Sequence, residues 1–204
     1  LCIGEPPEDL FKNNICLIFP ENTDRTSLYH DVQKIFFLYN SWEMEIRKAM
    51  QRNATLEEMC NLCIPIFEKP IFIHDRNNEL LAIANEMAGQ FSWQNDETFD
   101  KYYLPLEILN TFKSSDEYHK TLHTYGAHVF SAKATGYRTL YVNLRIEWVY
   151  VGRVCLDEIG TPIRKRDYEL LEFFADNIAL AMQQGMLLVS DVSNVLSILF
   201  KEMI

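Results

Sequence analysis

Glycine and proline are scarce in this sequence, with 7 of each among 204 residues. This scarcity excludes a linker-rich or low-complexity chain. No apolar run reaches the roughly 20 residues that a membrane-spanning helix needs, and no secretory signal is visible. Apolar residues make up 48% of the chain and include 13 Phe and 10 Tyr. We therefore expect one large domain, or one domain with an appendage, built around a sizeable core.

A disulfide framework is also lacking, because the five cysteines are odd in number and four of them lie in apolar runs. A reduced, cytoplasmic setting fits this usage best. Thr55 and Glu58 have the spacing of a capping box, and the helix that they open carries Cys60 and Cys63 on its apolar stripe. No second pair with this spacing is present to complete a zinc site. We predict core cysteines rather than a redox or zinc pair.

Basic residues are in the minority, with 19 Lys and Arg against 29 Asp and Glu, which gives a formal net charge of −10. A surface of this sign repels phosphate backbones, so we expect no direct nucleic-acid binding by this segment. The sequence starts at Leu1 rather than Met and stops at Ile204 inside an apparent helix. We expect it to be a piece of a longer protein.

The clearest pattern in the sequence is a pair of strands joined by a tight turn. Residues 138–144 and 148–156 alternate between apolar and polar side chains and are rich in Val, Leu, Tyr and Ile, which is typical of half-buried strands. Arg145 and Glu147 form the predicted turn. Thr161-Pro162, which follows, predicts a helix start, because the hydroxyl can cap and the proline ring fits the first turn.

Several further elements are expected upstream of this hairpin. Residues 70–75 and 80–84 flank an asparagine-containing turn, which predicts a second hairpin. Residues 85–137 are irregular by comparison. Within them we predict a short helix over 104–112 with Pro105 in its first turn, another over 116–123, and a central strand over 129–132. Together these elements predict an α+β fold, with a central antiparallel sheet flanked by helices.

A heptad seam runs along each of two long predicted helices. The first helix begins near Thr26, and the second runs from about Ile163 to about Met203, longer than a small domain is wide. The seam of the first comprises Leu28, Val32, Ile35, Tyr39, Trp42, Ile46 and Ala49. The seam of the second comprises Leu171, Ile178, Gly185, Val192 and Leu199, together with Ala175, Met182, Val189, Leu196 and Met203. Over residues 171–182 we expect the stripe to cover the sheet, and beyond Gly185 we predict a homodimeric bundle formed by both terminal helices.

A family resemblance rests on the order and spacing of these segments. A hairpin that feeds a long helix resembles the C-terminal half of a GAF-type sensory domain. The segments EKPIFIHDRNNELLAIAN, LPLEIL, GYRTLYVNL and VGRVCLDEIG together resemble the central sensory region of a PucR-type transcriptional regulator. The closing segment VSNVLSILFKEMI is similar to the linker before the helix-turn-helix of such proteins. The resemblance covers about residues 26–204 and none of its motifs is catalytic.

The resemblance implies a GAF/PAS-like sheet in a cytoplasmic domain that responds to an unknown small-molecule effector. It implies contact with DNA only through a C-terminal helix-turn-helix that this sequence lacks, and it implies no cofactor. On this basis the chain divides into four expected parts. They are a remnant of an upstream α/β segment (1–25), N-terminal signalling helices (26–68), a GAF-like sensory core (69–160) and a C-terminal dimerisation and output helix (161–204).

The resemblance also places a ligand over one face of the sheet, beneath residues 85–137. Aromatic walls with one cation suit a small planar or carboxylate-bearing metabolite. Arg138 is the cation expected to need an anionic partner. The candidate binding residues are His74, Trp93, Tyr102, Tyr103, Tyr125, His128, Arg138 and Tyr141. The alternative for each is simple packing in an aromatic-rich core.

Catalytic and metal-binding patterns are weak. His119 and His123 have the i, i+4 spacing of metal ligands, but no carboxylate between them can act as a base. A GAF-type methionine sulfoxide reductase would need several cysteines beside the pocket, whereas Cys155 stands alone in its strand. We therefore expect neither an enzyme nor a metal site. Three hypotheses follow, namely a ligand sensor, a dimerisation scaffold without ligand, and a small redox or metal enzyme.

Overall fold

The fold is that of a computed structural model, which describes residues 2–4, 16–98 and 101–202, with side chains described as far as Gly185. The chain forms two compact units, Leu1–Ser41 and Trp42–Ile204. In the first unit, β1 (Cys2–Ile3) and β2 (Ile18–Phe19) pair in parallel, and helix α1 (Arg25–Gln51) begins. The Asp24 carboxylate accepts the Ser27 amide at 2.7 Å and caps this helix.

The second unit starts with the last turns of α1, followed by α2 (Leu56–Asn61) and α3 (Ile64–Phe67). In this part of α1 the predicted seam residues Trp42, Ile46 and Ala49 are buried. The predicted capping box is confirmed, because the Thr55 hydroxyl accepts the Glu58 amide and the Glu58 carboxylate accepts the Thr55 amide. Both reciprocal bonds satisfy first-turn N–H groups that have no helical acceptor.

Replacing Thr55 with alanine is expected to lower the free energy of unfolding by about 1 kcal/mol, because the Glu58 amide loses its acceptor. Thr55→Ser keeps the hydroxyl and should retain most of the stability. Urea unfolding followed by circular dichroism measures both changes. Equal losses in the two variants would mean that the threonine methyl group, not the cap, matters here.

The core of the second unit is a five-stranded sheet, which confirms the predicted α+β fold with a central antiparallel sheet. Its strands are β3 (Ile71–Asp75), β4 (Leu80–Ala84), β7 (Ala127–Phe130), β8 (Thr139–Ile146) and β9 (Val149–Asp157). Their order is β4-β3-β9-β8-β7, with every neighbouring pair antiparallel. The predicted central place of the strand near 129–132 is wrong, because β7 pairs only with β8 at the edge. The centre belongs to β9, whose last six residues are all buried.

Both predicted hairpins are present, with changes at one turn. Asn78 takes a positive φ of 64° between β3 and β4, a conformation that asparagine tolerates well. Between β8 and β9 the positive-φ residues are Glu147 (48°) and Trp148 (71°). The sequence assigned Trp148 to the second strand and Arg145 to the turn. The structure reverses these two assignments, because β8 continues to Ile146 and a two-residue turn follows.

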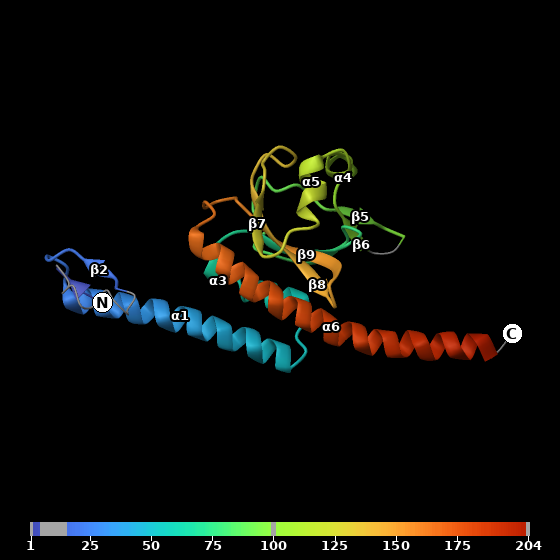
Figure 1. Cartoon of the computed structure of the whole chain (residues 1–204), viewed down its shortest axis with the longest axis horizontal. Coiled ribbons are helices and arrows are strands. Elements are labelled where there is room, and N and C mark those ends of the chain that lie inside the picture. The colour runs from blue at the N-terminus through green and yellow to red at the C-terminus, as the bar shows by residue number, and fades with distance from the viewer. Residues whose placement is uncertain (1, 5–15, 99–100, 203–204) are drawn as a thin grey trace. The chain divides into compact units, whose positions relative to one another are not determined.

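Helix α6 (Lys165–Glu202) lies against one face of the sheet, mainly along β8 (Figure 1). Its predicted apolar positions Leu171, Ala175 and Ile178 are buried there, as is Phe174. The helix was predicted from about Ile163 with Thr161 as its cap, and it begins two residues later, at Lys165, where the Asp167 carboxylate accepts the Arg164 amide. The predicted seam side chains Val189, Val192, Leu196, Leu199 and Met203 lie outside the described residues. None of the described helices is long and apolar enough to cross a membrane.

The opposite face of the sheet is covered by the segment between β4 and β8, with α4 and α5 above it (Figure 1). This segment contains β5 (Gln94–Asp96) and β6 (Lys101–Tyr103), which pair with each other and were not predicted. It also contains α4 (Leu106–Lys113) and α5 (Asp116–Thr121). The predicted helices are confirmed in type but shorter. Pro105 precedes α4 instead of lying in its first turn, and α5 ends before His123.

Candidate ligand-binding site

The register of the sheet places polar side chains in one row beneath the cover. His74 of β3 pairs with Arg153 of β9, which pairs in turn with Asn143 of β8. The next row on the same face holds Phe72, Cys155, Tyr141 and His128. Because side chains alternate along each strand, both rows point away from α6 and toward the covering segment. A charged residue thus lies in the middle of the sheet, on its covered face.

A cavity of about 40 Å³ lies between this face and the cover. It is lined by Phe72, His74, Phe91, Leu104, Phe112, Tyr118, Phe130, Thr135, Thr139, Tyr141, Arg153 and Cys155. Most of the lining is aromatic, and a few polar groups converge within it, which is the usual make-up of a small-molecule site. The cavity exceeds the roughly 10–15 Å³ that one water needs, so it accepts a group of a few atoms without rearrangement.

Arg153 is the polar centre of this cavity and is only 4% exposed. Its Nε donates to Asn143 Oδ1 and its Nη2 to Thr121 Oγ1, each at 2.9 Å. Its guanidinium carbon lies 4.3 Å from the centre of the Tyr141 ring and 5.5 Å from that of Tyr118. Two hydrogen bonds and two ring faces therefore hold the guanidinium in one orientation.

His74 lies directly beside Arg153 and is buried. Its Nδ1 is 2.8 Å from the carbonyl oxygen of Asp75, which can only accept, so Nδ1 carries the proton. Burial, together with the charge on Arg153, lowers the pKa of His74 from 6.5 to about 4. The imidazole is therefore neutral at pH 7 and adds no charge to the cavity.

Asp157 lies on the same face of β9, two residues beyond Cys155, and is fully buried. It accepts hydrogen bonds from Thr139 Oγ1 at 2.7 Å and Gln90 Nε2 at 3.0 Å. Burial raises the pKa of this carboxyl to about 6, although these bonds oppose the shift. Through Gln90, the carboxylate ties the covering segment to the central strand of the sheet.

Three of the five cysteines, Cys60, Cys63 and Cys155, are core residues in the structure. Cys60 and Cys63 are fully buried, in and just after α2, and do not line the cavity. Burial raises the pKa of Cys60 to about 12 and that of Cys63 well above its ordinary value. Cys155 lines the cavity, and burial raises its pKa strongly as well. None of these three thiols is ionised at neutral pH, so none is an activated nucleophile.

The structure brings only part of the predicted binding set to the cavity. His74 and Tyr141 line it, and Trp93 packs against Phe72 with ring centroids 5.3 Å apart. Tyr102 is 45% exposed beside Trp93, and Tyr103 lies at the end of β6. Tyr125 is exposed beneath the guanidinium of Arg145, and His128 is exposed although its ring leans on that of Tyr141.

Arg138 is placed differently from the sequence prediction. It is exposed, and its Nε donates to Glu158 Oε2 at 2.6 Å. The anionic partner that we predicted for this arginine is therefore a carboxylate of the same chain, and not a ligand. Arg138 does not line the cavity described above, and Arg153 occupies the place that the prediction gave it. The pattern that could have shown this is a lone arginine in the apolar strand VGRVCL.

The predicted histidine pair is separated by the shorter helix. His119 Nε2 lies 3.0 Å from the carbonyl oxygen of Lys113, whereas His123 follows the end of α5. Across the described part of the chain, no three His, Cys, Asp or Glu side chains lie close enough to hold a metal ion.

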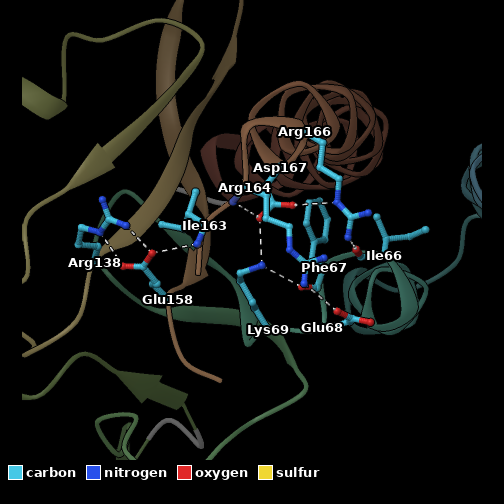
Figure 2. A network of polar contacts seen from close by, with 10 residues as sticks. All are labelled: Ile66, Phe67, Glu68, Lys69, Arg138, Glu158, Ile163, Arg164, Arg166 and Asp167. Atoms are coloured by element: carbon cyan, nitrogen blue, oxygen red, sulfur yellow. Dashed lines mark hydrogen bonds and ion pairs between the residues drawn. The ribbon is translucent and has the colours of Figure 1, made fainter. Parts of the chain in front are cut away.

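The start of α6 is joined to β3 by a network of polar contacts (Figure 2). Lys69 Nζ lies 3.0 Å from Asp167 Oδ2, and both side chains are fully buried. Lys69 also donates to the Phe67 carbonyl at 3.1 Å, and Asp167 accepts the Arg164 amide at 2.9 Å. At the edge of the network, Arg164 pairs with Glu68 at 3.4 Å. Since only Pro70 separates Lys69 from β3, this ion pair connects the cavity-bearing sheet to α6.

The strand order, the covered cavity and the long helix on the opposite face define a GAF fold. The phycoerythrobilin-bound GAF domain from a cyanobacterial phytochrome is similar to this chain at a TM-score of 0.52 and 10% identity, covering 72% of this chain and 96% of that domain. The phycocyanobilin-bound GAF domain from a cyanobacterial phytochrome gives a TM-score of 0.50 at 11% identity, covering 72% and 95%. At such identities the likeness concerns the fold alone. No model of a known family matches the chain, and no curated protein matches it either.

Proposed function

We propose that this chain is a sensory domain that binds a small molecule between the sheet and its cover and reports occupancy through α6. The observation that carries the proposal is the cavity itself, in which a buried guanidinium is held by neutral groups among aromatic walls. Both GAF domains compared above contain a bound small molecule, which supports a binding role for the same fold in this chain. The Lys69–Asp167 pair supplies a direct connection from the sheet to α6.

The proposal makes the domain a binding module rather than an enzyme. Cys155 is the thiol that lines the cavity, and its raised pKa leaves it protonated at neutral pH. The buried His74 is neutral, and its Nδ1 is engaged by a backbone carbonyl. Among the described residues no hydrogen bond joins these two groups into a nucleophile–base pair, which supports binding over turnover.

We further propose that the domain belongs to a PucR-type regulator, in which it dimerises in the cytoplasm and acts on a helix-turn-helix located elsewhere in the protein. The exposed apolar residues of α1 support a helical partner, since Tyr29, Ile35, Phe36 and Phe37 are each more than half exposed. Analytical ultracentrifugation tests the dimer. The coding sequence after Ile204 tests the regulator, which requires a helix-turn-helix there.

Native mass spectrometry of gently purified protein tests the sensory function, followed by a thermal-shift screen of small metabolites. We expect either a co-purified small molecule or a compound that raises the melting temperature, together with a change in tryptophan fluorescence from Trp93. A protein that carries no small molecule, and whose melting temperature no compound moves, would instead be a dimerisation scaffold with the same fold.

A further inference from the structure

We propose that Arg153 anchors the carboxylate of a small organic acid, which is the class of ligand that the cavity binds. The inference rests on the sensory function proposed above and names the ligand class for the same cavity. The first observation is that, in the part of the chain that the structure describes, the buried positive charge of Arg153 has no negative charge paired with it. Among the described residues, Arg153 donates only to the neutral oxygens of Asn143 and Thr121, and no carboxylate forms an ion pair with it.

Three other cations of the second unit are paired with carboxylates. The buried Lys69 is paired with the buried Asp167, and the more exposed Arg138 and Arg164 each face a glutamate. A buried cation without an anion is costly, because it has lost water and gained no opposite charge. A fold that keeps such a cation beside a cavity leaves the anion to be supplied from outside.

The geometry of the guanidinium favours a carboxylate in particular. Arginine presents five N–H groups in a planar fork, and the hydrogen bonds of Arg153 to Asn143 and Thr121 engage two of them. The remaining donors match the two oxygens of a carboxylate. Tyr141 and Tyr118 already fix the plane of the guanidinium, so binding an acid costs little further ordering of this side chain.

The rest of the lining limits the body of the ligand. His74 is neutral, so the anionic charge of a ligand meets one cation, which fits a monoanion better than a phosphate dianion. Phe72, Phe112 and Phe130 form apolar walls. The cavity of about 40 Å³ accommodates a carboxylate head, and a larger body displaces side chains of the covering segment. We therefore infer a monocarboxylate with a small apolar or aromatic body.

Matched pairs of probes test this inference by thermal shift and isothermal titration on the whole chain. Benzoate and isovalerate are compared with benzamide and isovaleramide, which have the same shapes without the charge, and with inorganic phosphate. We expect the carboxylates to raise the melting temperature of the wild-type protein while the amides and phosphate leave it unchanged. Arg153→Gln is expected to weaken carboxylate binding by about thirtyfold or more. Arg138→Gln removes an exposed arginine outside the cavity and should bind as the wild type does.

A second variant separates a loss of binding from a loss of folding. Arg153→Lys keeps the charge but lacks the planar fork, so it should fold and still bind carboxylates several-fold more weakly. Amides that bind as well as acids, phosphate that binds in their place, or an Arg153→Gln protein that binds acids at wild-type affinity would each overturn the inference. The sensory function would survive any of these results, because a ligand would still bind. A wild-type protein that binds neither these probes nor any compound of the metabolite screen would reject both.

Discussion

Replacing Asp167 with asparagine is expected to lower the free energy of unfolding by about 3–5 kcal/mol. Lys69 is fully buried, and its ammonium group contacts the Asp167 carboxylate and the carbonyl of Phe67. Asparagine has nearly the same shape and can still accept the Arg164 amide, so the change removes the charge and little else. The ammonium of Lys69 is then left without an opposite charge in a place that water does not reach. Urea unfolding at pH 7 measures the loss.

A carboxylate whose partner is exposed to solvent provides the matched control for this variant. Glu158 pairs with Arg138, whose side chain is 51% exposed, so Glu158→Gln should cost less than about 1 kcal/mol. The double variant Lys69→Met, Asp167→Leu removes both charges together and should recover most of the stability that Asp167→Asn loses. Similar losses from Asp167→Asn and Glu158→Gln would mean that water screens the buried pair in solution. The link from the sheet to α6 would then be weak.

The sequence was sufficient for the parts of this fold that depend on local chemistry. The Thr55–Glu58 capping box, the hairpin around Asn78 and the apolar stripe from Leu171 to Ile178 all appear where spacing predicts them. Each depends on residues within a few positions of one another. The order of the strands depends on residues far apart in the sequence. For that reason the prediction places the strand near residue 129 at the centre of the sheet, whereas it lies at the edge.

The site was harder to predict for the same reason. Both Arg138 and Arg153 belong to the two predicted strands of the hairpin, and only the register shows that Arg153 faces the cavity beside His74. The partner of Arg138, Glu158, lies 20 residues away in the sequence and meets it across the β8–β9 pair. A single sequence does not reveal which arginine is paired within the chain. The signal in the sequence that could have identified Arg153 is that it is the lone arginine in an apolar strand, because a charged side chain is rarely buried without a partner.

Acidification from pH 7 to pH 4 is expected to change the stability through two buried groups in opposite directions. The pKa of His74 falls from 6.5 to about 4 on folding, so below pH 6.5 the unfolded chain binds a proton that the folded protein does not. This group therefore removes stability on the order of 3 kcal/mol as the pH falls toward 4. The pKa of Asp157 rises from 3.8 to about 6 on folding, so the folded protein binds that proton first. Asp157 therefore adds stability, again on the order of 3 kcal/mol, as the pH falls from 7 to 4.

Asparagine at position 157 separates the two contributions. Asp157→Asn cannot take up the compensating proton, so its stability should fall more steeply than that of the wild type between pH 6 and pH 4. Adding His74→Gln to that variant should remove the loss that His74 causes, whereas adding His123→Gln, which replaces an exposed histidine, is the matched control. Urea midpoints at intervals across this range give the profiles, and the shared contribution of other carboxylates cancels between variants. Parallel profiles for the wild type and Asp157→Asn would show that Asp157 has the same proton affinity folded and unfolded. In that case water reaches the Asp157 carboxylate at the end of the central strand, and burial does not raise its pKa.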